Sequence, residues 1–101
     1  MSIEINLAKK AILDKLEAQV KTVAAKLDTL KARAETAKAN IEIKAITELL
    51  ARKQTILQKL QELKKSGEDR WAHVKTDIEA QIADFEKSVK ELESKLKAKA
   101  S

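Results

Sequence analysis

His73 is the residue whose surroundings in the sequence come closest to metal chemistry. It is the only histidine, and Asp69 and Asp77 lie four residues before and after it. On a helix these three side chains share one stripe, and an imidazole with carboxylates is a donor set that divalent metals accept. A single helix directs too few ligands at one ion, however, and a second histidine is missing. We therefore predict a solvated helix face here and no metal site.

Pairs of acidic and basic residues recur along the chain, but their spacing explains them without catalysis. Glu86 and Lys90, like Lys87 and Glu91, lie four positions apart, the spacing of stabilising charge pairs on a helix surface. A catalytic pair needs a pocket that shifts its pKa, and no phosphate loop, nucleophile elbow or metalloprotease helix motif is present. Cysteine is absent, so no thiol can act as nucleophile or metal ligand. We predict no enzymatic activity, no catalytic residues and no cofactor.

The composition indicates that helices carry all these side chains. The chain of 101 residues has one glycine and no proline, and its only aromatic residues are Trp71 and Phe85. Its small aliphatic residues alternate with lysine, glutamate and glutamine, as in coiled coils, whereas sheets need frequent turn residues. The stretch from Met1 to Leu16 mixes charges with its apolar residues, unlike a signal peptide or a spanning helix. We predict an all-α, cytoplasmic protein.

A heptad seam runs along the first part of the chain. Its apolar residues alternate spacings of three and four, which keeps a narrow stripe on a supercoiled helix. We call these residues the N-terminal seam: Leu13, Leu16, Val20, Val23, Leu27 and Leu30. The spacing slips past Ile41 and heptads resume at Ile56, but no glycine or proline interrupts the run. The pattern predicts one helix from about residue 3 to residue 65.

A turn at Ser66 and Gly67 is expected to end this helix. Two lysines before the turn suit the negative end of the helix dipole, and Gly67 can take the left-handed conformation that closes a last turn. Ser66 can cap a second helix, with Asp69 three residues on. That helix is expected over residues 68–99, folded back antiparallel on the first. The residues predicted to pack this hairpin are Ile56, Leu60, Leu63, Trp71, Val74, Ile78 and Phe85.

The second helix is too short to cover the N-terminal seam. Antiparallel partners joined by a short turn cover equal lengths, so it reaches back only to about Arg33. An apolar stripe left in water favours self-association. We therefore predict a homodimer or higher homo-oligomer of hairpins, with two long helices antiparallel and each about 90 Å long. The alternative is a compact three-helix bundle, in which the first helix breaks between Ala37 and Asn40 and Asn40 caps the middle helix.

The stretch from Leu60 through the Ser66-Gly-Glu-Asp-Arg-Trp71 turn to Ala80, with the heptads before it, resembles a set of small bacterial coiled-coil proteins of unassigned function. Their pattern centres on a Ser-x-(Glu/Asp)-Asp-x-Trp turn followed by an amphipathic tail. The resemblance covers the last two thirds of the chain. It departs where those proteins tend to carry a second tryptophan, since Ile82 stands there. The resemblance implies a helical hairpin and supplies no activity.

Function is therefore expected to lie in contacts with other molecules. We predict a structural or protein-interaction protein that presents its helical sides to a protein partner. The alternative is an amphipathic coat on a lipid or granule surface, but narrow seams with few aromatics differ from the broad apolar face of interfacial helices. A third hypothesis is weak, salt-sensitive binding of nucleic acid, but glutamates interrupt the basic residues, so no specific nucleic acid partner is expected. Trp71 shares a stripe with Val74 and Ile78, and we expect it to plug the end of the hairpin.

Overall fold

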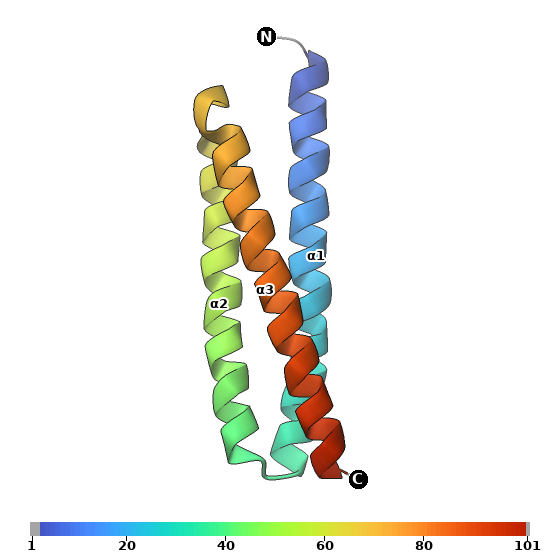
Figure 1. The fold of residues 1–101 in the computed structure, drawn as a ribbon. Helices are drawn as coiled ribbons and strands as arrows, with labels where there is room; N and C mark the ends of the chain where they lie inside the picture. The colour runs from blue at the N-terminus through green and yellow to red at the C-terminus, as the bar shows by residue number, and fades with distance from the viewer. Residues whose placement is uncertain (1–2, 101) are drawn as a thin grey trace.

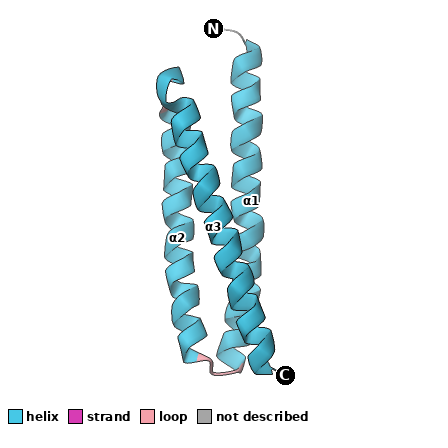
Figure 2. Ribbon diagram, in the orientation of Figure 1, coloured by secondary structure: helices cyan, strands magenta, loops and turns pink. Residues whose placement is uncertain are grey.

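The chain folds into three helices that lie along one another. A computed structural model describes the backbone of residues 3–100 and the side chains of residues 7–98. The helices are α1 (Ile3–Thr36), α2 (Asn40–Lys65) and α3 (Glu68–Ala100), and the described residues contain no strand (Figure 2). The all-α prediction is confirmed. The two-helix hairpin with one long helix is wrong, because the arrangement is that of the three-helix alternative.

Successive helices run in opposite directions along the bundle. Figure 1 shows α1 and α3 pointing the same way and α2 running back between their ends, so that α1 begins at one end of the bundle and α3 finishes at the other. The Cα atoms span 56 × 17 × 15 Å. A helix of 34 residues at about 1.5 Å per residue accounts for most of that length. The bundle is therefore one helix long, well short of the extended hairpin expected from the sequence.

The break between α1 and α2 is a Schellman motif built without glycine. The N–H of Ala39 donates to the carbonyl of Ala34 at 2.9 Å, and the N–H of Lys38 donates to that of Glu35 at 3.1 Å. These are the two bonds that close a helix when the residue after the C-cap turns left-handed. That residue is Lys38, whose φ is 54°. The motif thus stops α1 at a lysine, where a glycine is usual.

The apolar contact of this motif explains why the turn forms here. Ala34 and Ala39 flank the turn and are 0% and 8% exposed. Such a contact across the last turn commonly accompanies the Schellman bonds. Asn40 does not cap α2, because the N-cap residue is Ala39 and it makes no side-chain capping bond. The prediction of a continuous helix failed because it relied on glycine and proline as the signals of a break.

Replacing Lys38 by glycine should stabilise the bundle. A side chain in the left-handed region costs about 1–2 kcal/mol, part of which is offset by the greater freedom of glycine in the unfolded chain. We expect Lys38→Gly to raise the free energy of unfolding by about 0.5–1 kcal/mol in urea denaturation. Lys31→Gly is the matched control, since Lys31 is exposed inside α1. The free energy of unfolding of Lys31→Gly should fall by about 0.5–1 kcal/mol. A lower free energy of unfolding in both variants would contradict the left-handed turn at Lys38.

The core is a column of aliphatic side chains with one aromatic ring. Phe85 is 0% exposed. Each helix contributes residues at three-and-four spacing, so each turns one stripe inward. The largest fully buried side chains are Val20, Leu27, Leu30, Ile46, Ile56, Leu63, Ile78, Phe85 and Val89.

The N-terminal seam belongs to this core, and the expectation that it lies bare is wrong. Leu13, Leu16, Val20, Leu27 and Leu30 are buried, and Val23 is partly buried against the same cluster. The physical reason is the turn at residues 37–39, which returns α2 along α1 and lets α3 pack against both (Figure 1). The apolar stripe is therefore covered by the chain's own helices and gives no reason for a second copy to bind.

The turn between α2 and α3 lies at Ser66 and Gly67, but these residues act differently from the expectation. The Ser66 hydroxyl donates to the Leu63 carbonyl at 2.9 Å, so it closes α2 and does not cap α3. Gly67 is not left-handed. Its carbonyl accepts the N–H groups of Arg70 and Trp71, both at 3.1 Å. Gly67 therefore precedes α3 and accepts its first hydrogen bonds, and the extended backbone of Ser66 makes the reversal.

Candidate functional site

His73 and its neighbouring aspartates are not gathered into a ligand group in the part of the chain that the structure describes. His73 is exposed on α3. Asp77 is engaged elsewhere: its Oδ2 lies 3.1 Å from the Lys59 Nζ on α2 and accepts a hydrogen bond from Gln81 at 3.2 Å. Within residues 7–98, no group of three histidine, cysteine or acidic side chains is placed to hold an ion. The carboxylate of Asp77 therefore joins α2 to α3.

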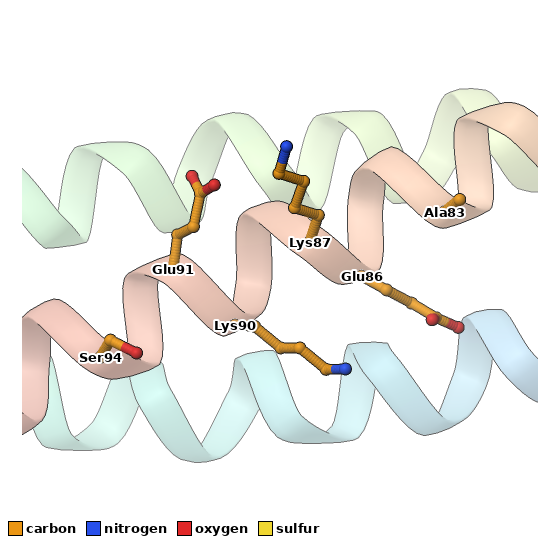
Figure 3. Close-up of a pocket in the computed structure, with 6 residues that line it drawn as sticks. All are labelled: Ala83, Glu86, Lys87, Lys90, Glu91 and Ser94. Carbon is orange, nitrogen blue, oxygen red and sulfur yellow. The ribbon is translucent and has the colours of Figure 1, made fainter.

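The acidic and basic pairs on α3 lie on an open helix surface. A shallow hollow of about 360 Å³ is lined by Ala83, Glu86, Lys87, Lys90, Glu91 and Ser94, all from this one helix. In Figure 3, Lys87 and Glu91 extend toward the α2 side, while Glu86 and Lys90 extend toward the α1 side. No second element covers these side chains, so water reaches them and cannot be excluded from a reaction. This surface lacks the concavity that a catalytic pair needs.

A cleft at the end of the bundle surrounds Trp71. Its volume is about 460 Å³, and its lining residues come from the start of α1 and from the α2–α3 turn. The Lys9 Nζ lies 5.0 Å from the centre of the Trp71 ring and 4.0 Å from the Glu68 carboxylate. The ring is partly buried against the core cluster. Trp71 thus holds the first turns of α1 to the turn between the other helices, and its indole packs within the chain.

Further polar contacts join the helices side by side. Lys26 on α1 lies 3.1 Å from the carboxylate of Glu93 on α3. Arg52 on α2 donates from Nη1 to the Ser88 hydroxyl at 3.4 Å. Each contact brings together residues far apart in the sequence, so the three fix how the helices are aligned along the bundle axis: Lys26–Glu93, Lys59–Asp77 and Arg52–Ser88. Contacts of this exposed kind add little stability, but they disfavour other alignments.

The Glu93 carboxyl should report on the contact between α1 and α3. The hydrogen bond from Lys26 is the main cause that holds the pKa of Glu93 below its ordinary value. A carboxyl whose pKa is lowered by folding stabilises the native state at neutral pH, and this contribution disappears as the pH falls through its folded pKa. We expect Lys26→Met to raise the pKa of Glu93 in an NMR titration. Lys21→Met is the control, since Lys21 lowers the pKa of Glu17 within α1, and it should leave Glu93 unchanged.

Glu42 is a buried carboxylate that sequence reasoning did not single out. It is 4% exposed and lies in the first turn of α2. The positive end of the helix dipole favours a carboxylate at that position. An acidic residue near a helix start is informative only once that start is known, and the sequence does not mark a helix start at Asn40 with glycine or proline. Glu42 therefore belongs to the start of α2, beside the α1–α2 turn, and lies at the other end of the bundle from the cleft around Trp71.

A second heptad pattern, also missed, covers the outward face of α1. Alanine recurs at every seventh position and threonine falls between, all of them exposed: Ala11, Ala18, Thr22, Ala25, Thr29, Ala32 and Thr36. The hydroxyls of the three threonines donate to carbonyls four residues earlier, at 2.9–3.3 Å. The centre of this outward face therefore carries small, uncharged side chains, in a chain of which 37% of residues are charged.

None of the described helices combines the length and the apolar character needed to cross a bilayer. Comparisons with protein families, curated protein sequences and solved structures give no match to this chain. The described helices form a three-helix bundle, and the hollows along α3 and around Trp71 are open to solvent.

Proposed function

We propose that this chain is a non-enzymatic protein-interaction bundle that binds a protein partner through the outer sides of its helices. The observation that carries the proposal is the division between core and surface. The seam residues that a coiled-coil partner would use are already packed in the chain's own core. What remains for a partner is a set of long, straight outer faces, stiffened by packing along the whole bundle.

The chemistry of the surface supports binding over catalysis. The hollows along α3 and around Trp71 are open, and Glu17 and Glu93, whose pKa values lie below the ordinary value, are carboxylates held by lysines on the surface. Perturbed groups of an active site are expected inside a pocket. A rigid helical side, in contrast, suits a groove or a second helix of another protein.

Site-specific photo-crosslinking tests this proposal. A photoreactive residue is placed at Ala25 on α1, Gln58 on α2 or Ala83 on α3, one exposed position for each helix, and the variants are expressed in the source cells. We expect one protein adduct of defined mass from one face and none from the other two. The same background of adducts from all three faces, or none from any, would overturn the proposal.

A coat on a lipid or granule surface would require the bundle to open. Large apolar side chains that lie exposed in the described part are Leu7 and Ile41, at 61% and 77%; Leu7 lies near the start of α1 and Ile41 near the start of α2, at opposite ends of the bundle. Separate residues of this kind do not make an interfacial face. Co-sedimentation with anionic vesicles tests the alternative directly, and binding accompanied by exposure of Trp71 to lipid would favour it over protein binding.

A further inference from the structure

The turn between α1 and α2 holds a conflict between its conformation and its composition. It consists of three residues, 37–39, and Lys38 is left-handed with a φ of 54°. The surrounding sequence, Lys31 to Ala39, is rich in alanine, lysine and glutamate, which favour a continuous helix. A short connection under such strain is the kind that exchanges elements between copies of a chain.

The start of α2 shows a second cost of the closed turn. Ala39, the N-cap residue, makes no side-chain capping bond to the N–H groups in the first turn of α2. In a continuous helix these N–H groups would bond to the carbonyls of residues 36–38 instead. Ile41 is the second residue of α2 and is 77% exposed. It stands seven residues after Ala34 and fourteen after Leu27, so in a continuous helix it would rejoin their buried stripe.

We propose that two copies of this chain exchange α1 to form a dimer in which α1 and α2 become one helix. Residues 37–39 straighten, and α1 of each copy packs between α2 and α3 of the other. All core contacts are kept, because they are made across chains instead of within one. The two continuous helices lie antiparallel, with the former turns side by side at the centre and Ile41 covered there.

The exchange predicts which ion pair changes partner. Lys26 and Glu93 join α1 to α3, at 3.1 Å, and therefore would lie on different chains in the dimer. Lys59 and Asp77 join α2 to α3, also at 3.1 Å, and would stay within one chain. A carbodiimide links a lysine amine to a carboxylate only at such contact. The two pairs are thus a test and an internal control in the same molecule.

The experiment mixes unlabelled and ¹⁵N-labelled chains in denaturant, refolds them at high concentration and isolates the dimer by size-exclusion chromatography. After carbodiimide treatment, mass spectrometry reads the isotope composition of each cross-link. We expect half of the Lys26–Glu93 links to join a light and a heavy chain, and no Lys59–Asp77 link to do so. The absence of a dimer, or a dimer in which both links stay within single chains, would overturn the proposal.

Variants at the turn test the same exchange independently. Glycine accepts the left-handed conformation and weakens a helix, so Lys38→Gly should raise the dissociation constant of the dimer by about a hundredfold, or about tenfold for each of its two turns. Lys31→Gly lies within α1 in both forms and should leave that constant unchanged. An unchanged dimer in Lys38→Gly would show that the turn does not open. The photo-crosslinking test above concerns the outer faces, so either proposal can fail without the other.

Discussion

Leu27→Asp is expected to unfold the chain. Leu27 is 0% exposed on α1 and belongs to the core cluster to which α2 and α3 also contribute. A carboxylate placed there has no partner, and an unpaired buried charge together with the lost leucine costs several kcal/mol. A domain of this size has about 5–15 kcal/mol of stability in total. We expect the far-ultraviolet circular dichroism of the variant at 25 °C to lose most of its helical signal.

Ala25→Asp is the matched control for this experiment. Ala25 lies two residues earlier on the exposed face of α1, where a carboxylate remains hydrated. This variant should keep the parental spectrum and a melting temperature close to the parental value. If Leu27→Asp were a folded, helical monomer, the N-terminal seam would be an interface between chains, as the hairpin prediction held, and its place in the core would be contradicted.

Phe85→Ala should cause the second largest loss. Phe85 is the only phenylalanine and is 0% exposed in a core otherwise made of aliphatic side chains. Removing a buried ring leaves a cavity that small neighbours cannot fill, which costs about 3–5 kcal/mol. Urea denaturation should show a lower midpoint with a nearly unchanged slope, since the surface exposed on unfolding stays similar.

Phe85→Leu separates the loss of volume from the loss of the ring. A large aliphatic residue fills most of the same space, so we expect a loss of about 1.5 kcal/mol or less. Equal losses from Phe85→Ala and Phe85→Leu would mean that the site does not depend on packing volume. A loss below about 1 kcal/mol in both would contradict the burial of the ring.

The sequence was sufficient for the helices and insufficient for the turn between the first two. The three-and-four spacing from Leu13 to Leu30 identified residues that the structure buries, because inward stripes follow from helix geometry alone. The end of α1 depended on an alanine contact and a left-handed lysine. The residues that form this helix end include neither glycine nor proline, which mark most helix ends. Local composition favours a helix through this point, and tertiary packing overrides it.

The competition between local composition and tertiary packing also explains why the predictions for the N-terminal seam and Ser66 were wrong. Covering the N-terminal seam requires either a second chain or a reversal at residues 37–39, and spacing alone cannot choose between them. Ser66 was expected to cap α3, yet its hydroxyl bonds back to α2, because serine serves either end of a helix. The alanine and threonine heptad on the outer face of α1 is also visible as a spacing of seven, but its small side chains give a weaker apolar signal than the leucines and valines of the N-terminal seam.

Small-angle X-ray scattering at low micromolar concentration tests the central claim, that one chain folds by itself as a three-helix bundle. The structure has a Cα radius of gyration of 16.3 Å and a longest Cα dimension of 56 Å. We expect scattering from a particle with the mass of one chain, 11.3 kDa, and a length close to that dimension plus side chains and hydration. A particle of twice this mass and about 90 Å or longer at the same low concentration would contradict the claim, because it would require α1 and α2 to form one continuous helix.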